Sequence, residues 1–145
     1  MRKTIYETNY TRLSKIMNGE LENMKGNYKL KSKGFMDLVI EKLRVASDKT
    51  FVISLAHYYE QNGDLMADPD MEIKVYPELK AIEVLNYTNH SLGFYREVYF
   101  EEDGKKYVKN VLKRDLNDFL RTWLKNLESQ GFNYANEQKE VVSNE

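Results

Sequence analysis

The chain has 145 residues, of which 41% are hydrophobic and 31% charged, and its formal net charge is −1. This length suits one domain, because a chain of this size buries roughly 70% of the surface that it exposes when unfolded. The 22 basic and 23 acidic residues nearly balance, so no overall field attracts nucleic acid or an anionic membrane. The absence of cysteine excludes disulfides, thiol nucleophiles and thiolate metal sites.

The distribution of apolar residues predicts a single domain that does not associate with a membrane. No apolar run approaches the roughly 18 residues that span a bilayer, and no apolar signal segment follows the basic residues at the start of the chain. We therefore expect a cytoplasmic protein. Residues 1–132 are predicted to form one α+β domain. Residues 133–145 are polar, follow a predicted helix end at Gly131, and are predicted to form a flexible tail.

The first part of the chain is predicted to contain a helix and two strands. Apolar residues between positions 9 and 24 recur at helical spacing, and Asn9 or Thr8 is expected to cap the start of this helix. Gly19 weakens it, so a break near that position is expected. Residues 28–33 alternate between lysine and other side chains, as in a strand, and β-branched residues favour a second strand at 35–45.

Residues 51–76 are predicted to form the central β-hairpin. Apolar residues alternate with polar ones in both of its arms, which is typical of strands that are buried on one side. Between the arms, Asn62-Gly63 provides the positive backbone angles of a tight turn. Asp68-Pro69-Asp70 is expected to add a second bend, so the acidic segment from Asp64 to Glu72 is predicted to be a loop.

The remainder of the chain predicts two more strands, a short final strand and a closing helix. The strands are expected at 81–87, at 94–100 and at 107–108, and the helix at 111–129. Short turns between consecutive strands favour an antiparallel meander. The predicted fold is therefore α+β: an antiparallel five- to six-stranded meander sheet, with the N-terminal and C-terminal helices packed on one face.

The closing helix carries the pattern NxFLxxWLxxLxxxG, which begins at Asn117 and ends at Gly131. With the segment NYTRL at 9–13 and the strand MEIKVY at 71–76, the chain resembles the YqiB-like family of small bacterial domains of unknown function. The segment GDLMADPDM is similar to related domains that phages and conjugative elements carry. This resemblance implies a fold more than a function.

The leading functional hypothesis concerns the aromatic residues, since the chain has 11 tyrosines and six phenylalanines. Tyrosines from several strands, including Tyr87, are predicted to line one face of the sheet, and such a face can bind a peptide or a second subunit. The hypothesis is a small non-catalytic binding or accessory protein that binds a protein partner or forms a homodimer. The predicted binding residues are His57, Tyr58, Tyr59, Tyr76, Tyr95 and Tyr99.

The acidic segment suggests an alternative, a metal-dependent enzyme. In an extended chain, Asp68, Asp70 and Glu72 alternate onto one side, where hard oxygen ligands hold magnesium, manganese or calcium. His57 would then act as a general base or a further ligand. The competing interpretations are a solvated turn for the carboxylates and a core or rim position for His57. Phosphate loops, zinc motifs and nucleophile elbows are absent from the sequence, which predicts no cofactor and identifies no catalytic residue.

Nucleic-acid binding is a further interpretation that we do not favour. Lysines at 29–33 and 105–113 lie beside the aromatic strands, and stacking with phosphate contacts would bind a single strand. Acidic residues between these lysines, such as Glu101 and Glu102, argue against it. The resemblance to mobile-element domains adds one more hypothesis, an inhibitor of host nucleic-acid defence.

Overall fold

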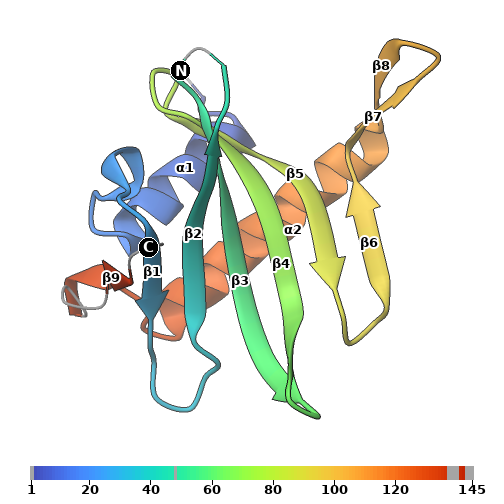
Figure 1. Ribbon diagram of the computed structural model, residues 1–145. Coiled ribbons are helices and arrows are strands. Elements are labelled where there is room, and N and C mark those ends of the chain that lie inside the picture. Colours follow the sequence, from blue (N-terminus) through green and yellow to red (C-terminus); the bar gives the residue numbers. More distant parts are fainter. Residues whose placement is uncertain (1, 48, 137–140, 143–145) are drawn as a thin grey trace.

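The computed structural model describes residues 2–47, 49–136 and 141–142 (Figure 1). Within these residues, the helical elements are α1 (Ile5–Ile16), η1 (Leu21–Asn23), α2 (Asn110–Ser129) and η2 (Tyr134–Asn136). The strands are β1 (Asn27–Leu30), β2 (Leu38–Val45), β3 (Phe51–Gln61), β4 (Asp64–Tyr76), β5 (Ala81–Asn89), β6 (Phe94–Glu97), β7 (Tyr99–Glu102), β8 (Lys105–Val108) and β9 (Val141–Val142). The chain is therefore α+β, as its sequence predicts.

Strands β1 to β6 form an antiparallel sheet in which each strand pairs with its neighbours in the sequence. The meander therefore has six strands rather than five, and the two-residue β9 pairs with β1 at one edge as a seventh strand of the sheet. Strands β7 and β8 form a separate two-stranded sheet. The prediction of one strand over 94–100 is wrong, because β6 ends at Glu97 and β7 begins after Val98, which is fully buried.

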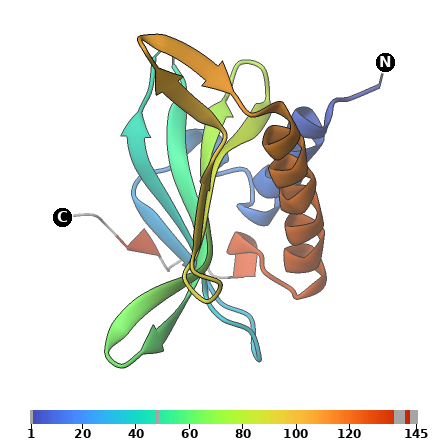
Figure 2. The ribbon, with the colours of Figure 1, turned by 90° about the vertical axis from the view of Figure 1, so that its right-hand side faces the viewer.

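Figure 2 shows α1 and α2 on the same side of the six-stranded meander. The sheet side chains of the buried core include Ile53 and Leu55 of β3 and Met71, Ile73 and Val75 of β4. Five α2 side chains belong to the same core: Leu116, Leu120, Trp123, Leu124 and Leu127. Burying one such large apolar side chain stabilises the fold by about 1.5–3 kcal/mol, so α2 contributes much of the packing energy.

Helix α1 begins earlier than the sequence analysis predicts. Its N-cap is Thr4, whose hydroxyl accepts a hydrogen bond from the Glu7 N–H at 3.2 Å. The Glu7 carboxylate in turn accepts from the Thr4 N–H at 3.0 Å, which completes a capping box. The predicted cap at Thr8 or Asn9 is wrong, and Asn9 is a fully buried residue within the helix. The expected break agrees with the structure, since α1 ends at Ile16 and Gly19 has a φ of 81°.

The acidic segment is a strand and not a loop. The turn at Asn62-Gly63 forms as predicted, with φ values of 53° and 84°. Strand β4 then begins at Asp64 and continues to Tyr76, so the predicted bend at 68–70 is wrong. The pairing of β3 with β4 shifts register between Ala56 and Tyr58, opposite this part of β4. The β3–β4 hairpin therefore continues on both sides of this register shift.

Part of the predicted tail is packed against the domain. Tyr134 lies edge-on to Tyr28 with a ring-centroid distance of 5.1 Å, and β9 pairs with β1. The rest of the predicted tail, 137–140 and 143–145, lies outside the described residues. Across the part of the chain that the structure describes, no helix is both long and apolar enough to cross a membrane.

Candidate functional site: a cleft between α1, β5 and α2

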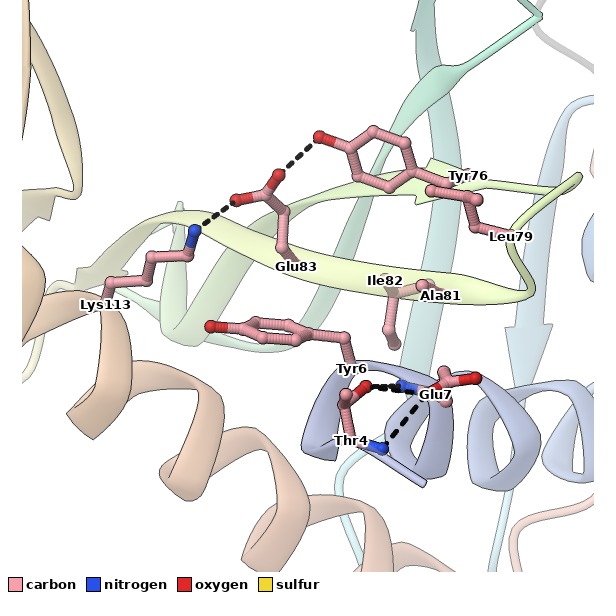
Figure 3. A pocket seen from close by; sticks show the side chains of 9 residues that line it. All are labelled: Thr4, Tyr6, Glu7, Tyr76, Leu79, Ala81, Ile82, Glu83 and Lys113. Carbon is pink, nitrogen blue, oxygen red and sulfur yellow. Dashed lines mark hydrogen bonds and ion pairs between the residues drawn. The ribbon is translucent and has the colours of Figure 1, made fainter. Parts of the chain in front are cut away.

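A cleft of about 360 Å³ lies where the start of α1, strand β5 and the first turns of α2 meet (Figure 3). Its lining residues are Thr4, Tyr6, Glu7, Tyr76, Leu79, Ala81, Ile82, Glu83 and Lys113. Figure 3 shows Tyr6 on one side of the opening and Tyr76 with Glu83 on the other. Aromatic and aliphatic walls with a few polar groups are typical of binding sites.

Local structure fixes the apolar walls of the cleft. The capping box at Thr4 and Glu7 starts α1 at a defined residue and so fixes the position of Tyr6. Ile82 is fully buried in β5, at the base of the cleft. Leu79 belongs to the turn between β4 and β5 and is 68% exposed. The cleft therefore has an apolar interior and an exposed aliphatic rim.

One end of the cleft is a polar cluster around Glu83. The hydroxyl groups of Tyr76 and Tyr99 both donate hydrogen bonds to the Glu83 carboxylate. The Lys113 ammonium lies 3.7 Å from the same carboxylate, and the side chains of Lys113 and Glu83 are mostly buried. Lys113 also lies over the rings of Tyr6 and Tyr99, at 5.5 and 5.6 Å from their centroids. Residues from α1, β4, β5, β7 and α2 are thus joined in one network.

The electrostatics of this cluster hold the two tyrosines in their neutral form. Burial raises the pKa of Tyr76, and the hydrogen bond to Glu83 raises it further. The same two causes, in the same order, raise the pKa of Tyr99. The hydrogen bond with Tyr99 raises the pKa of Lys113, and the Glu83 charge adds to the effect. Neutral phenols and a charged ammonium are suited to binding and orientation rather than to proton transfer near neutral pH.

The structure places the predicted tyrosines in separate environments. Only Tyr76 and Tyr99 of the predicted set meet, at the Glu83 cluster. Tyr58 donates a hydrogen bond to Asp70 at 3.2 Å, while the Tyr59 hydroxyl lies 3.0 Å from the Ser91 hydroxyl. Tyr95 is exposed on the edge strand β6, and Tyr87 is buried against Phe119 under the helices. These residues do not form one aromatic face.

His57 lies beneath the helices and is 8% exposed. Its Nδ1 atom is 3.0 Å from the Asp37 carbonyl oxygen. Its ring packs against Trp123 and Phe132, with centroid distances of 5.6 and 5.8 Å. These contacts are those of a hydrogen-bonded residue at the rim of the core.

The three predicted carboxylate ligands each have a different set of partners. Asp68 accepts hydrogen bonds from Asn89 and Ser91, both at 3.0 Å. Asp70 accepts one from the Ser54 hydroxyl at 2.6 Å. Glu72 pairs with Arg44 at 3.1 Å. Within the described ranges, no group of three or more His, Cys, Asp or Glu side chains is placed to hold a metal ion.

Sequence reasoning did not find Tyr6 or Glu83 as site residues, and it included Lys113 only among the lysines of the nucleic-acid interpretation. The Thr4-x-x-Glu7 pattern is a recognisable capping box, and it could have placed Tyr6 at the start of a helix. No local pattern reveals that Glu83 and Lys113 are partners, because they lie on a strand and a helix that only the tertiary fold brings together.

Comparison with known proteins identifies a family but no characterised relative. No curated protein and no solved structure matches the chain. The model of the family described as a domain of unknown function (DUF6908) matches residues 8–133. This match includes β4, β5 and α2, and it provides no support for the YqiB-like resemblance or for a link to mobile elements. The chain belongs to the DUF6908 family of domains of unknown function.

Proposed function

We propose that this protein is a non-catalytic binding protein that receives an apolar side chain of a partner protein in the cleft between α1 and β5. The observation that carries the proposal is the cleft itself, with Tyr6, Tyr76 and Ile82 around a space of about 360 Å³. Protein interfaces derive most of their affinity from a few large side chains that fill such pockets.

The rim of the cleft favours a protein partner over a small molecule. Ligand pockets range from about 300 to 1,000 Å³, so this cleft is at the small end and suits one aromatic or branched aliphatic side chain. Leu79 stands exposed beside the opening, where the rest of a partner's surface would cover it. Apolar and aromatic residues are enriched at the centres of protein interfaces.

The Glu83 cluster supports binding rather than catalysis. The carboxylate already accepts from two tyrosines and pairs with Lys113, so its strong hydrogen-bonding capacity is used inside the protein. These contacts hold Tyr76 and Lys113 in place around the opening. A wall with little freedom loses little conformational entropy when a partner binds, and this raises affinity.

The test compares two leucines that are similarly exposed, of which only one lies at the cleft. Leu79 is 68% exposed at the cleft and Leu92 is 63% exposed in the turn before β6. Wild type, Leu79→Glu and Leu92→Glu are each used to capture partners from the host, and light scattering records self-association. We expect wild type and Leu92→Glu to capture the same partner, or the same second copy, and Leu79→Glu to lose it.

A direct probe accompanies the capture. N-acetyltryptophanamide, which carries one large aromatic side chain, is titrated into the isotope-labelled protein and followed by amide NMR. We expect saturable shifts around Tyr6, Ile82 and Lys113. The proposal is refuted if the probe shifts no cleft residue, or if Leu79→Glu and wild type capture the same partners.

A further inference from the structure

A second hollow, which shares no lining residue with the cleft, runs along the outer surface of α1 beside the end of α2. Its volume is about 250 Å³, and its lining residues are Lys3, Thr8, Thr11, Arg12, Lys15 and Glu128. Positions 8, 11, 12 and 15 follow helical spacing, so their side chains share one face of α1. The groove is lined by three cationic side chains, Lys3, Arg12 and Lys15, and by one carboxylate, Glu128. It is therefore locally positive, although the whole chain has a net charge of −1.

Arg12 combines an ion pair with an unpaired donor. One of its terminal nitrogens, Nη1, lies 3.1 Å from the Glu128 carboxylate and so connects α1 to α2. Its Nε atom is buried and has no hydrogen-bond acceptor among the described residues. An unpaired buried donor costs about 1–3 kcal/mol, and more when the group is charged. The Nε atom is covered by protein, but the side chain as a whole is 31% exposed, so an oxyanion in the groove would approach the terminal nitrogens of the guanidinium.

Other donors in the groove also have capacity for an anion. Lys3 and Lys15 form no ion pair with a residue that the structure describes. Lys3 does act on Glu7, whose pKa is lowered chiefly by its hydrogen bonds with Thr4 and slightly by the Lys3 charge. The Thr11 hydroxyl is already used, since it donates to the Glu7 carbonyl at 3.1 Å. Lys3 and Lys15 therefore supply positive charge that no described ion pair neutralises, and Arg12, which is paired with Glu128, adds hydrogen-bond donors.

We propose that this groove binds a phosphate group carrying two negative charges, either as free phosphate or as a phosphate monoester. Arginine forks match the geometry of phosphate oxygens, and lysine ammonium groups add charge without strict direction. Thr8 provides a hydroxyl on the same helix face. A phosphate with two charges gains more from three cations than a diester with one charge does, so monoesters and free phosphate are the preferred ligands.

The experiment titrates the full chain with four probes at constant ionic strength: sodium phosphate, O-phosphoserine, dimethyl phosphate and sodium chloride. Amide NMR follows the residues of α1. We expect saturable shifts at Thr8, Thr11 and Lys15 with phosphate or phosphoserine, and none with chloride. Tighter binding of phosphoserine than of phosphate would identify a phosphate carried on a larger molecule as the ligand, and the reverse would identify free phosphate.

Two single-charge variants provide the comparison. Lys15→Gln removes one cation of the groove, and Lys106→Gln removes an exposed lysine on β8. We expect Lys15→Gln to weaken phosphate binding about tenfold and Lys106→Gln to leave it within about twofold. Thr8→Val, which keeps every charge, should also weaken binding. Neither test depends on Arg12, whose replacement would break the contact between α1 and α2.

Three results would overturn the proposal. The first is the absence of a saturable shift in α1 with either phosphate or phosphoserine. The second is an equal loss of affinity in Lys15→Gln and Lys106→Gln, which would indicate a diffuse charge effect. The third is binding of dimethyl phosphate as tight as that of phosphate. Because the groove and the cleft share no residue, these results leave the proposed function untouched.

Discussion

Replacement of Asn117 by alanine should destabilise the protein strongly, because the buried side chain of this α2 residue is hydrogen-bonded to strand β5. Its Oδ1 atom accepts a hydrogen bond from the Val84 N–H of β5 at 3.1 Å, and its Nδ2 atom donates to the Lys113 carbonyl at 2.7 Å. Its own carbonyl accepts from the Asn9 side chain at 3.1 Å. The residue is fully buried, so water cannot replace these partners.

The magnitude follows from the groups that the substitution leaves unpaired. Without the Asn117 oxygen, the Val84 N–H is a buried donor with no acceptor, which costs about 1–3 kcal/mol. The cavity left by the truncated side chain adds about 1 kcal/mol, while the better helix propensity of alanine returns roughly 0.5 kcal/mol. We therefore expect Asn117→Ala to lower the free energy of unfolding by about 1.5–3.5 kcal/mol.

Urea denaturation followed by circular dichroism measures this loss as a lower midpoint with an unchanged slope. Asn126→Ala is the matched control, because Asn126 lies on the exposed side of the same helix, and it should change stability by less than about 0.5 kcal/mol. A loss below about 1 kcal/mol in Asn117→Ala would refute the argument, since the penalty for a buried unpaired N–H would then be missing.

Three further predictions concern single side chains. Asn9→Leu should cost less than Asn117→Ala in urea denaturation, because the Asn9 Oδ1 atom already lacks a partner among the described residues. Burial raises the pKa of Asp70 in the folded protein above its ordinary value of 3.8. The unfolded chain therefore loses this proton at a lower pH than the folded protein does, and the free energy of unfolding falls as the pH rises from 3.8 through the folded pKa. Urea midpoints measured at several pH values should show a smaller fall in Asp70→Asn than in the wild type. Arg96 donates to the Tyr95 carbonyl on the edge strand β6 at 3.0 Å, so Arg96→Ala should increase edge-to-edge self-association in sedimentation.

Each of these three has a result that would contradict it. A loss in Asn9→Leu as large as that in Asn117→Ala would mean that the amide donor dominates the network. An unchanged pH dependence in Asp70→Asn would show that the folded and unfolded pKa values are equal. If Arg96→Ala sediments as a monomer to the same extent as the control variant Arg121→Ala, Arg96 does not protect the edge strand β6 from self-association.

Sequence periodicity alone predicts the elements whose stability comes from one buried face. The closing helix is predicted over 111–129 and extends from Asn110 to Ser129, because seven large apolar residues recur at helical spacing. The β3–β4 hairpin is also predicted, since Asn62-Gly63 requires positive φ at both positions and alternation defines both arms. In these elements the local pattern and the tertiary packing favour the same conformation.

Local pattern is misleading where tertiary pairing overrides it. The Asp68-Pro69-Asp70 segment has the composition of a turn, but Ala67 pairs with β3 before it and Asp70 pairs with β3 and β5 at its end, so strand β4 continues through it. Alternation also implies that Asp68 and Asp70 share a face with Glu72. In the structure, Asp68 contacts Asn89 and Ser91, whereas Asp70 contacts Ser54 and Tyr58, because a register shift interrupts the regular pleat.

The sequence by itself determines the α+β class, the antiparallel pairing of neighbours and the helix that closes the domain, because each depends on contacts between residues near one another in the chain. Only the tertiary structure decides where the cleft and the α1 groove lie. Glu83 and Lys113 are 30 positions apart, and Arg12 and Glu128 are 116 apart. A pairing over such a distance depends on how a helix docks on a sheet, and no short-range periodicity records that geometry.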